Sequence, residues 1–175
     1  MKILLNQHQL SITLQRLAHQ IVENQSGESE LAIVGLQPRG IWFSDRIVQI
    51  LKKIDAPKIF YGKLDITFYR DDVHTSKAIL VPEQTDISFS VENKKLILID
   101  DVLHTGRTIR AAMDALLDFG RPKTVELMVL IDRHFSRELP IQPDYVGRTI
   151  DTIITQKVKV NWKENEGIDE VQLID

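Results

Sequence analysis

The chain has 175 residues, of which 43% are hydrophobic and 27% are charged, the composition of an ordinary globular domain. It contains no cysteine, which excludes a disulfide framework, a thiol nucleophile and cysteine metal sites. The net charge of −3 does not indicate a nucleic-acid-binding protein, although a local basic face stays open, and no apolar run suits a signal peptide or a membrane span. We therefore expect a single cytoplasmic domain over residues 1–175, without a membrane partner.

Helical and strand-like patterns alternate along the first half of the chain. Apolar residues at helical spacing predict an amphipathic helix over residues 7–25, and the apolar run at 31–36 predicts a buried strand. A second helical pattern covers 41–54, and partial alternation predicts an extended segment over 59–68. Residues 69–93 have no regular period, and a long loop of this kind in a compact domain is usually functional or disordered.

The clearest pattern in the chain lies at residues 96–120. Four apolar residues, 96–99, predict a buried parallel strand that ends at Asp100 and Asp101. A small polar loop follows, and Gly120 suits the end of the helix after it. The helix is predicted to bury one face, made by Ile109, Ala112, Met113, Leu116 and Leu117.

The second half of the chain predicts a further strand at 124–131, ending at Asp132, and short late strands at 157–160 and 171–174. Strands that alternate with helices indicate an α/β fold with a mainly parallel sheet. Ligands bind beyond the carboxyl ends of such strands. The strand ends near Gly35, Asp100 and Asp132 are therefore expected to surround one cleft.

The loop after Asp101 suits a phosphate group, because it leads into a helix N-terminus with free N–H groups and partial positive charge. Gly106 permits close approach of the backbone, and Thr105 and Thr108 add hydroxyl donors. Arg107 could add a guanidinium, but the sequence leaves its direction open. Asp100 and Asp101 can accept hydrogen bonds from sugar hydroxyls or hold a hydrated Mg²⁺. Together these groups suggest a ribose 5-phosphate, and the chain lacks a Walker loop.

Residues 97–108 resemble the phosphoribosyl pyrophosphate (PRPP) motif of type I phosphoribosyltransferases. The resemblance implies a mainly parallel central sheet flanked by helices, with a flexible loop and a small hood. It implies that Asp100 and Asp101 are catalytic and meet the ribose hydroxyls, with Mg²⁺ held there through water and PRPP. The other implied PRPP-binding residues are Arg39, Gly40, Val102, Leu103, His104, Thr105, Gly106, Arg107 and Thr108. The alternative is a generic strand–turn–helix unit whose carboxylates face water.

The loop at residues 35–40 joins a strand to a helix, and its glycines and arginine suit an anion. In phosphoribosyltransferases this position is the pyrophosphate loop, which usually reads Gly-Ile-Lys-Thr-Arg-Gly. Gln37 and Pro38 therefore depart from the pattern, and Pro38 removes a backbone donor while making a cis peptide less costly. The alternative is a tight turn with a surface arginine at Arg39.

Residues 65–72 lead into the long irregular segment and include Arg70. An oxocarbenium-like transition state must be shielded from water, and an arginine must meet the departing pyrophosphate. The resemblance places the start of the flexible catalytic loop here, with Arg70 as the catalytic residue that reaches pyrophosphate. The alternative is a solvated, charged hairpin.

Residues 132–147 resemble most closely the pyrimidine-operon attenuation proteins (PyrR), which are also uracil phosphoribosyltransferases. The resemblance implies the reaction of uracil with PRPP to give UMP and pyrophosphate, and a homo-oligomer of two or more chains. The implied base-binding residues are His104, Asp132 and Arg133.

The same comparison shows departures on the surface that binds messenger RNA in the regulatory members. Gly-His-Arg is replaced by the longer residues 134–137, an arginine is replaced by Gln142, and Arg16 follows Gln15 rather than threonine. Arg16, Arg137 and Arg148 remain as candidate contacts to a pyrimidine-operon leader, or as ordinary surface. Three hypotheses stay open: a uracil phosphoribosyltransferase, an RNA-binding attenuator that senses UMP and PRPP with little catalysis, and a phosphoribosyltransferase for another base.

Overall fold

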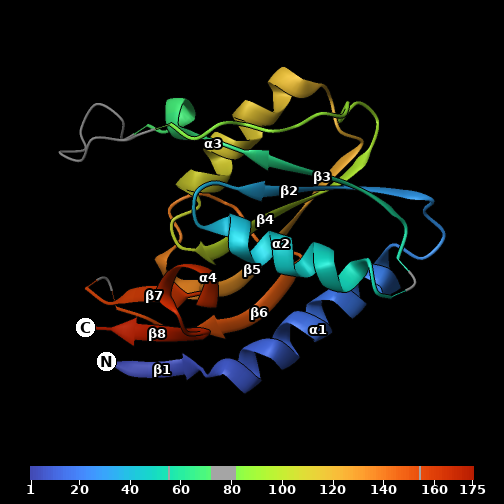
Figure 1. Cartoon of the computed structure of the whole chain (residues 1–175). Helices are drawn as coiled ribbons and strands as arrows, with labels where there is room; N and C mark the ends of the chain where they lie inside the picture. The colour runs from blue at the N-terminus through green and yellow to red at the C-terminus, as the bar shows by residue number, and fades with distance from the viewer. Residues whose placement is uncertain (55, 72–81, 154) are drawn as a thin grey trace.

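The structure is a computed structural model that describes residues 1–54, 56–71, 82–153 and 155–175. A five-stranded sheet with helices on both faces forms the body of the molecule (Figure 1). Its elements are α1 (Gln7–Asn24), β2 (Glu30–Leu36), α2 (Gly40–Leu51), β3 (Lys58–Leu64), β4 (Lys95–Leu103), α3 (Arg107–Leu116), β5 (Thr124–Arg133) and β6 (Tyr145–Ile150). Short 3-10 helices cover Thr67–Tyr69 (η1), Leu117–Phe119 (η2) and His134–Ser136 (η3).

A three-stranded antiparallel sheet lies beside this body and carries both ends of the chain (Figure 1). It contains β1 (Lys2–Leu5), β8 (Glu170–Ile174) and β7 (Lys157–Asn161), in that order, with α4 (Lys163–Glu166) between β7 and β8. We call these elements the hood. The amino group of Met1 lies 3.4 Å from the Asp175 carboxylate.

The larger sheet has the strand order β3-β2-β4-β5-β6, and every neighbouring pair is parallel. Because all five strands run in the same direction, their carboxyl ends lie at the same edge of the sheet. The predicted α/β fold with a mainly parallel sheet flanked by helices is therefore confirmed. That edge is where ligands bind in such sheets.

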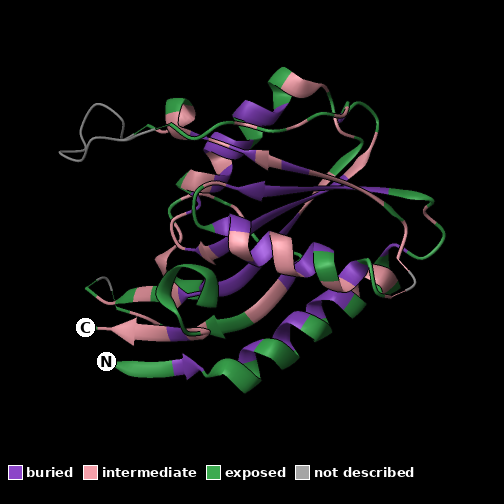
Figure 2. Ribbon diagram, viewed as in Figure 1, coloured by how far each residue is buried: buried purple, intermediate pink, exposed green. Residues whose placement is uncertain are grey.

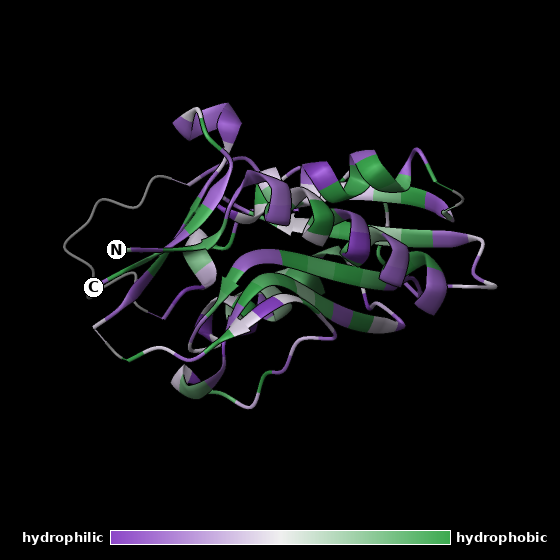
Figure 3. Ribbon diagram, turned by 90° about the horizontal axis from the view of Figure 1, so that it is seen from below, coloured by the Kyte–Doolittle hydropathy of each residue, from purple (hydrophilic) through white to green (hydrophobic). Residues whose placement is uncertain are grey.

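The central strands are buried on both faces, and alternate residues pack against different helices (Figure 2). Ile33 and Ile97 belong to the core with α1 and α2, whereas Val34 and Leu98 belong to the core with α3. The apolar residues accordingly concentrate in the middle strands (Figure 3). Two-sided burial explains why these strands read as continuous apolar runs in the sequence.

The hood is attached to α2 through Trp162, which is 1% exposed. Its ring lies parallel to that of Phe43, with 6.3 Å between the centroids. The Arg46 guanidinium lies 4.8 Å from the Trp162 ring and pairs with Glu164 and Asp169, each at 2.7 Å. These contacts place β7 over the start of α2, next to the carboxyl edge of the sheet.

Two predictions about local structure are wrong in detail. The extended segment ends at Leu64, and Phe68 lies in η1 with 78% of its surface exposed. Met113 of α3 and Leu117, which begins η2, are 41% and 65% exposed, while Ala111 and Ala115 are buried. Small alanine side chains let the helix backbone approach the sheet closely, so the buried face turns toward them and away from the larger residues.

Strands β1 and β6 were not predicted, because their short, partly polar sequences carry no clear alternation. The predicted irregular segment at 69–93 is confirmed for 82–93, apart from a bridge between Lys63 and Asp86. Residues 72–81, including Asp72 of the predicted catalytic loop, lie outside the described residues. Within the described part of the chain, no helix is long and apolar enough to cross a membrane.

Candidate active site

Two adjacent carboxylates lie near the end of β4, which continues to Leu103 and so beyond the predicted strand end. Asp100 and Asp101 are each 7% exposed, and the Asp101 N–H donates to Asp100 Oδ1 at 2.9 Å. Burial, and then the charge of Asp101, raises the pKa of Asp100 well above its usual range. Burial also raises the pKa of Asp101, against the opposing effect of the Arg39 charge. The pair is thus buried near the charge of Arg39, but among the described residues neither carboxylate makes an ion pair.

Two joined cavities open over the acidic pair. The first, which we call the loop cavity, measures about 210 Å³ and is lined by Asp100, Arg70, Asp71 and residues 102–109. The second, the central cavity, measures about 510 Å³. Its lining contains Gln37, Pro38, Arg39, Ile66, Arg70, Asp100, Asp101, Val102, His104, Thr108, Arg133, Lys157 and Val158. The predicted meeting of three strand ends is therefore observed, and most predicted PRPP-binding residues line one or both cavities.

The helices that begin at this edge lack side-chain caps. Helix α2 begins after Arg39 and α3 begins after Gly106, and neither residue caps its helix with a side chain. By contrast, α1 has a capping box between Asn6 and Gln9, with hydrogen bonds of 2.9 and 3.0 Å. N-termini without a capping side chain leave N–H groups and partial positive charge for an anion, although at α3 the Arg107 N–H also donates to Thr105 Oγ1 at 3.4 Å. Both cavities are therefore suited to phosphate groups.

Two glycines allow the backbone to pack as it does here. Gly106 has φ +93°, and a Cβ at this position would lie 3.2 Å from the Ile141 side chain. A Cβ on Gly40 would lie 2.7 Å from the Ile99 carbonyl oxygen, so only glycine lets α2 begin against β4. The peptide bond between Gln37 and Pro38 is cis, as the sequence suggested it could be.

Four cationic side chains line the central cavity, and three of them, besides Arg133, come from distant parts of the chain. Arg39 comes from the β2–α2 loop, Arg70 follows η1, and Lys157 opens β7 of the hood. Arg70 also lines the loop cavity, so it lies where the two cavities join. Lys157 was missed in the sequence, because only the placement of the hood brings it to the site and no local pattern marks it.

The part of the central cavity lined by His104 contains a buried cation. Arg133 is 5% exposed, and its guanidinium donates to Thr152 Oγ1 at 2.9 Å and to the Ile153 carbonyl at 3.4 Å. Burial lowers the pKa of Arg133, and no carboxylate among the described residues pairs with it. His104 lies in the same cavity, where burial, followed by the charge of Arg133, lowers its pKa. His104 is thus a neutral wall residue at pH 7.

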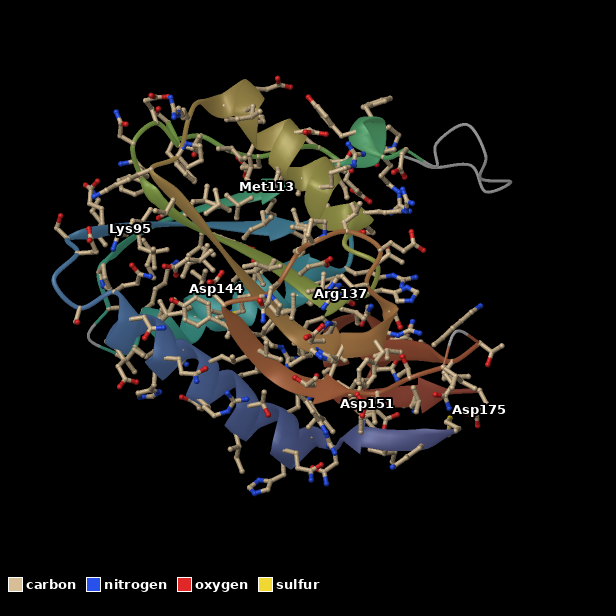
Figure 4. The ribbon with its side chains drawn as sticks, turned by 180° about the vertical axis from the view of Figure 1, so that it is seen from behind. Lys95, Met113, Arg137, Asp144, Asp151 and Asp175 are labelled. Atoms are coloured by element: carbon tan, nitrogen blue, oxygen red, sulfur yellow. The ribbon has the colours of Figure 1, made fainter. Side chains whose placement is uncertain are left out.

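Asp132, the third predicted base-binding residue, has a different position. Its carboxylate accepts a hydrogen bond from Arg137, which also donates to the His104 carbonyl. Asp132 lines a separate cavity of about 680 Å³ together with Arg137 and Gln142, and not the central cavity. In Figure 4, Arg137 lies toward the end of the sheet opposite Lys95, the residue that begins β4. The Arg137 side chain is only 17% exposed and turns inward.

The sequence left the direction of the Arg107 side chain open; in the structure Arg107 lines the loop cavity, and its guanidinium bonds to two carboxylates. Its Nε donates to Glu138 and its Nη1 to Asp71, both at 2.7 Å. The Thr105 carbonyl accepts N–H groups from Glu138 and Leu139 at 3.0 and 3.1 Å. The loop before α3 is therefore tied to the residues after η3.

The other two arginines predicted for RNA lie beside β6. Arg16 on α1 donates to the Gly147 carbonyl at 2.6 Å and to the Val146 carbonyl at 3.2 Å. Arg148 on β6 donates to the Leu4 carbonyl. Both residues are exposed, and their guanidinium groups brace α1 and β1 against β6.

A metal ion would find few protein ligands at this site. Among the described residues, no group of three or more histidine, aspartate or glutamate side chains could hold an ion. Asp100 and Asp101 offer hard oxygen ligands of the kind that Mg²⁺ prefers, which is compatible with an ion that also uses substrate and water oxygens.

Comparisons with known proteins agree in both sequence and structure. The phosphoribosyl transferase domain family matches residues 1–165. The Bifunctional protein PyrR of Elusimicrobium minutum is 44% identical over 173 residues, covering 99% of this chain and 96% of that protein. The Bifunctional protein PyrR of Halalkalibacterium halodurans is 42% identical over 174 residues, covering 98% and 96%.

Solved structures of lower sequence identity have the same fold. A hypoxanthine phosphoribosyltransferase from Staphylococcus aureus aligns with a TM-score of 0.73 at 20% identity, covering 97% of this chain and 90% of that one. One from Trypanosoma cruzi aligns with a TM-score of 0.78 at 16% identity, covering 99% and 95%. These likenesses concern the fold alone.

Proposed function

The chain belongs to the PyrR family and has the type I phosphoribosyltransferase fold, and on that premise we propose that it converts uracil and PRPP to UMP and pyrophosphate. One observation carries the proposal. A buried acidic pair that makes no ion pair with the described residues lies between two helix N-termini whose N-cap side chains do not cap them, in cavities that also contain Arg39 and Arg70. That arrangement offers acceptors for a sugar diol and donors for two phosphate-bearing groups.

The 5′-phosphate is assigned to the loop cavity. The backbone N–H groups of residues 105–108 and the hydroxyls of Thr105 and Thr108 are its donors. The ribose hydroxyls donate to Asp100 and Asp101, which replaces solvent at the two buried carboxylates. This binding mode explains why the pair needs no cation of its own.

Pyrophosphate is assigned to the central cavity, between Arg39 and Arg70. When the bond from C1′ to pyrophosphate breaks, negative charge grows on the leaving group and positive charge grows on the ribose. The arginines stabilise the first charge and the carboxylates the second. Mg²⁺, held by Asp100 and Asp101 with PRPP and water, would neutralise part of the pyrophosphate charge.

Uracil is assigned to the part of the central cavity lined by His104 and Arg133. The Arg133 guanidinium is a donor for a base carbonyl oxygen, since it is buried and lacks a carboxylate partner among the described residues. Neutral His104 forms an uncharged wall suited to a flat base. Main-chain N–H and C=O groups can also read a pyrimidine, so the identity of the base is the first part of the proposal to test.

The experiment is a base-panel assay. Purified protein is incubated with Mg²⁺, PRPP and labelled uracil, cytosine, hypoxanthine or guanine, and nucleotide and pyrophosphate are measured. We expect UMP and pyrophosphate in equal amounts from uracil and little product from the other bases. Failure to form UMP, or faster turnover of a purine, would reject uracil as the substrate.

A second function, RNA-binding attenuation, is favoured by two exposed arginines that lie close to β6, Arg16 on α1 and Arg148 on β6 itself. We propose that these residues contact the phosphates of a pyrimidine-operon leader, with UMP as the signal. Binding of such an RNA should then strengthen with UMP and weaken steeply with salt. Equal affinity for an unrelated RNA would dismiss this second function.

A further inference from the structure

We propose that Arg107 is a positioning residue that clamps together three segments of the active site, instead of binding phosphate with its side chain. The inference rests on the proposed function, because it concerns the same phosphate loop. It starts from the direction of the guanidinium: Nε meets Glu138 and Nη1 meets Asp71, both at 2.7 Å. Two of its nitrogens are thus committed to two carboxylates from different segments.

Each carboxylate that Arg107 holds is next in sequence to another arginine, one inside the site and one beside it. Asp71 follows Arg70, which lies where the two cavities join. Glu138 follows Arg137, which reaches Asp132 and the His104 carbonyl. A shift of either carboxylate would therefore displace an arginine directly bonded to it through the chain. Arg107 links the pyrophosphate side and the base side of the site through the loop that holds the 5′-phosphate.

Other contacts support the same connection on both sides. On the base side, the Glu138 and Leu139 N–H groups donate to the Thr105 carbonyl. On the other side, Arg110 Nη2 donates to the Tyr69 carbonyl at 2.9 Å, and the Tyr69 hydroxyl donates to Asp118. The first turns of α3 therefore anchor residues 69–71 as well as residues 138–139.

Loss of the clamp should change the positions of the active-site residues more than the free energy of unfolding. The side chains of Arg107, Asp71 and Glu138 are 51%, 40% and 52% exposed, and ion pairs this exposed add little to the stability of a fold. Positioning is more sensitive, since a displacement of about 1 Å at a catalytic group can cost a factor of about 100 in rate. We therefore expect an effect on turnover with little effect on unfolding.

The decisive variant is Arg107→Lys. Lysine keeps the positive charge and binds phosphate well as a point charge, but its single ammonium cannot span two carboxylates as the planar guanidinium does. If Arg107 clamps, Arg107→Lys should lower kcat/KM for PRPP by about tenfold, while the Kd for ribose 5-phosphate stays within about threefold. Arg121→Lys is the matched control, since Arg121 is exposed and no described ion pair involves it.

The partners provide an independent check. Asp71→Asn and Glu138→Gln should each lower kcat/KM a few-fold, and combining either with Arg107→Lys should add less than the sum of the single effects. Hydrogen exchange of the free protein supplies a readout that needs no turnover. In Arg107→Lys, peptides covering residues 66–71 and 137–141 should exchange faster than in wild type, with no change in Arg121→Lys.

Two results would overturn the clamp. The first is a tenfold or greater loss of ribose 5-phosphate affinity in Arg107→Lys with unchanged hydrogen exchange, which would make Arg107 a direct phosphate ligand. The second is that Arg107→Lys has the same kcat/KM for PRPP and the same hydrogen exchange as the Arg121→Lys control. If wild type forms no UMP, the proposed function fails, but the exchange arm still decides whether Arg107 joins the segments.

Discussion

Two neighbouring strands end in buried aspartates, and their surroundings differ. Asp100 and Asp101 at the end of β4 are 7% exposed and make no ion pair with the described residues, and burial raises the pKa of both. Asp132 at the end of β5 is 5% exposed and pairs with Arg137. Burial is similar at the two strand ends, so what separates them is the ion pair, which only Asp132 makes among the described residues.

The difference indicates which carboxylate works on a ligand. A buried carboxylate without a cation is costly, and a fold keeps it where a bound molecule supplies the missing donors. A buried carboxylate with its own arginine is already satisfied and holds its surroundings in place. We therefore propose that Asp100 and Asp101 on β4 bind the ribose, and that the ion pair of Asp132 with Arg137 holds the loop after β5 in place.

The largest effect should come from replacing both carboxylates of the β4 pair. Asp100→Asn with Asp101→Asn should lower kcat/KM for PRPP by about 1,000-fold, because the ribose loses its acceptors and the developing positive charge loses its stabilisation. Steady-state kinetics measures the loss. Thermal unfolding of the same variant should occur at an equal or higher Tm, and a loss of activity through unfolding would show as a lower Tm.

A smaller effect is expected at the buried cation of the base side. Arg133→Gln should lower kcat/KM for uracil by about 10- to 100-fold, the cost of losing a hydrogen bond from a charged donor. The Kd for ribose 5-phosphate, measured by calorimetry, should not change. Equal losses for uracil and ribose 5-phosphate would show that Arg133 acts on the whole site and does not contact the base.

Breaking the pair at β5 should affect stability more than chemistry. Asp132→Asn leaves Arg137 largely buried without its countercharge, so the free energy of unfolding should fall by about 1–3 kcal/mol. Urea denaturation measures this quantity, and kcat should stay within about threefold of wild type. A loss of activity as large as that of the Asp100→Asn, Asp101→Asn variant would contradict the structural role that we assign to Asp132.

The smallest effect concerns pH. The folded pKa of Asp100 lies above its unfolded value of 3.8, so over the interval between them the folded protein holds a proton that the unfolded chain has lost. Stability contributed by this group is present at low pH and declines as pH rises through that interval. Asp100→Asn should flatten the decline in urea denaturation experiments. Parallel curves for wild type and variant would contradict the assigned direction.

The segment from β4 to α3 could be predicted because its signals are local. An apolar run, two carboxylates, Gly106 and a helical period all lie within 26 residues of sequence, and the structure keeps them in that order. The same reasoning was right for Ile109, Ala112 and Leu116, which are buried. It failed for Met113 and Leu117, because packing against the sheet favoured Ala111 and Ala115.

Contacts across the chain could not be predicted. Strand β1 exists because Lys2 pairs with Leu173 at the other end of the sequence, and Lys157 reaches the site only because the hood is docked on α2. The directions of Arg107 and Arg137 depend on the turns that bring Asp71, Glu138 and Asp132 to them. Sequence gives the side chains available at a strand end, whereas pairing between them depends on the complete fold.

Calorimetric titration with UMP tests the contrast between the two strand ends most directly. UMP contains the 5′-phosphate, the ribose diol and the base, so one ligand probes every subsite that we assign except pyrophosphate. We predict that Asp132→Asn binds UMP within about threefold of wild type, while Asp100→Asn with Asp101→Asn binds at least about tenfold more weakly. The opposite order, with UMP binding lost in Asp132→Asn and retained in the double variant, would contradict the assignment of the ribose site to β4.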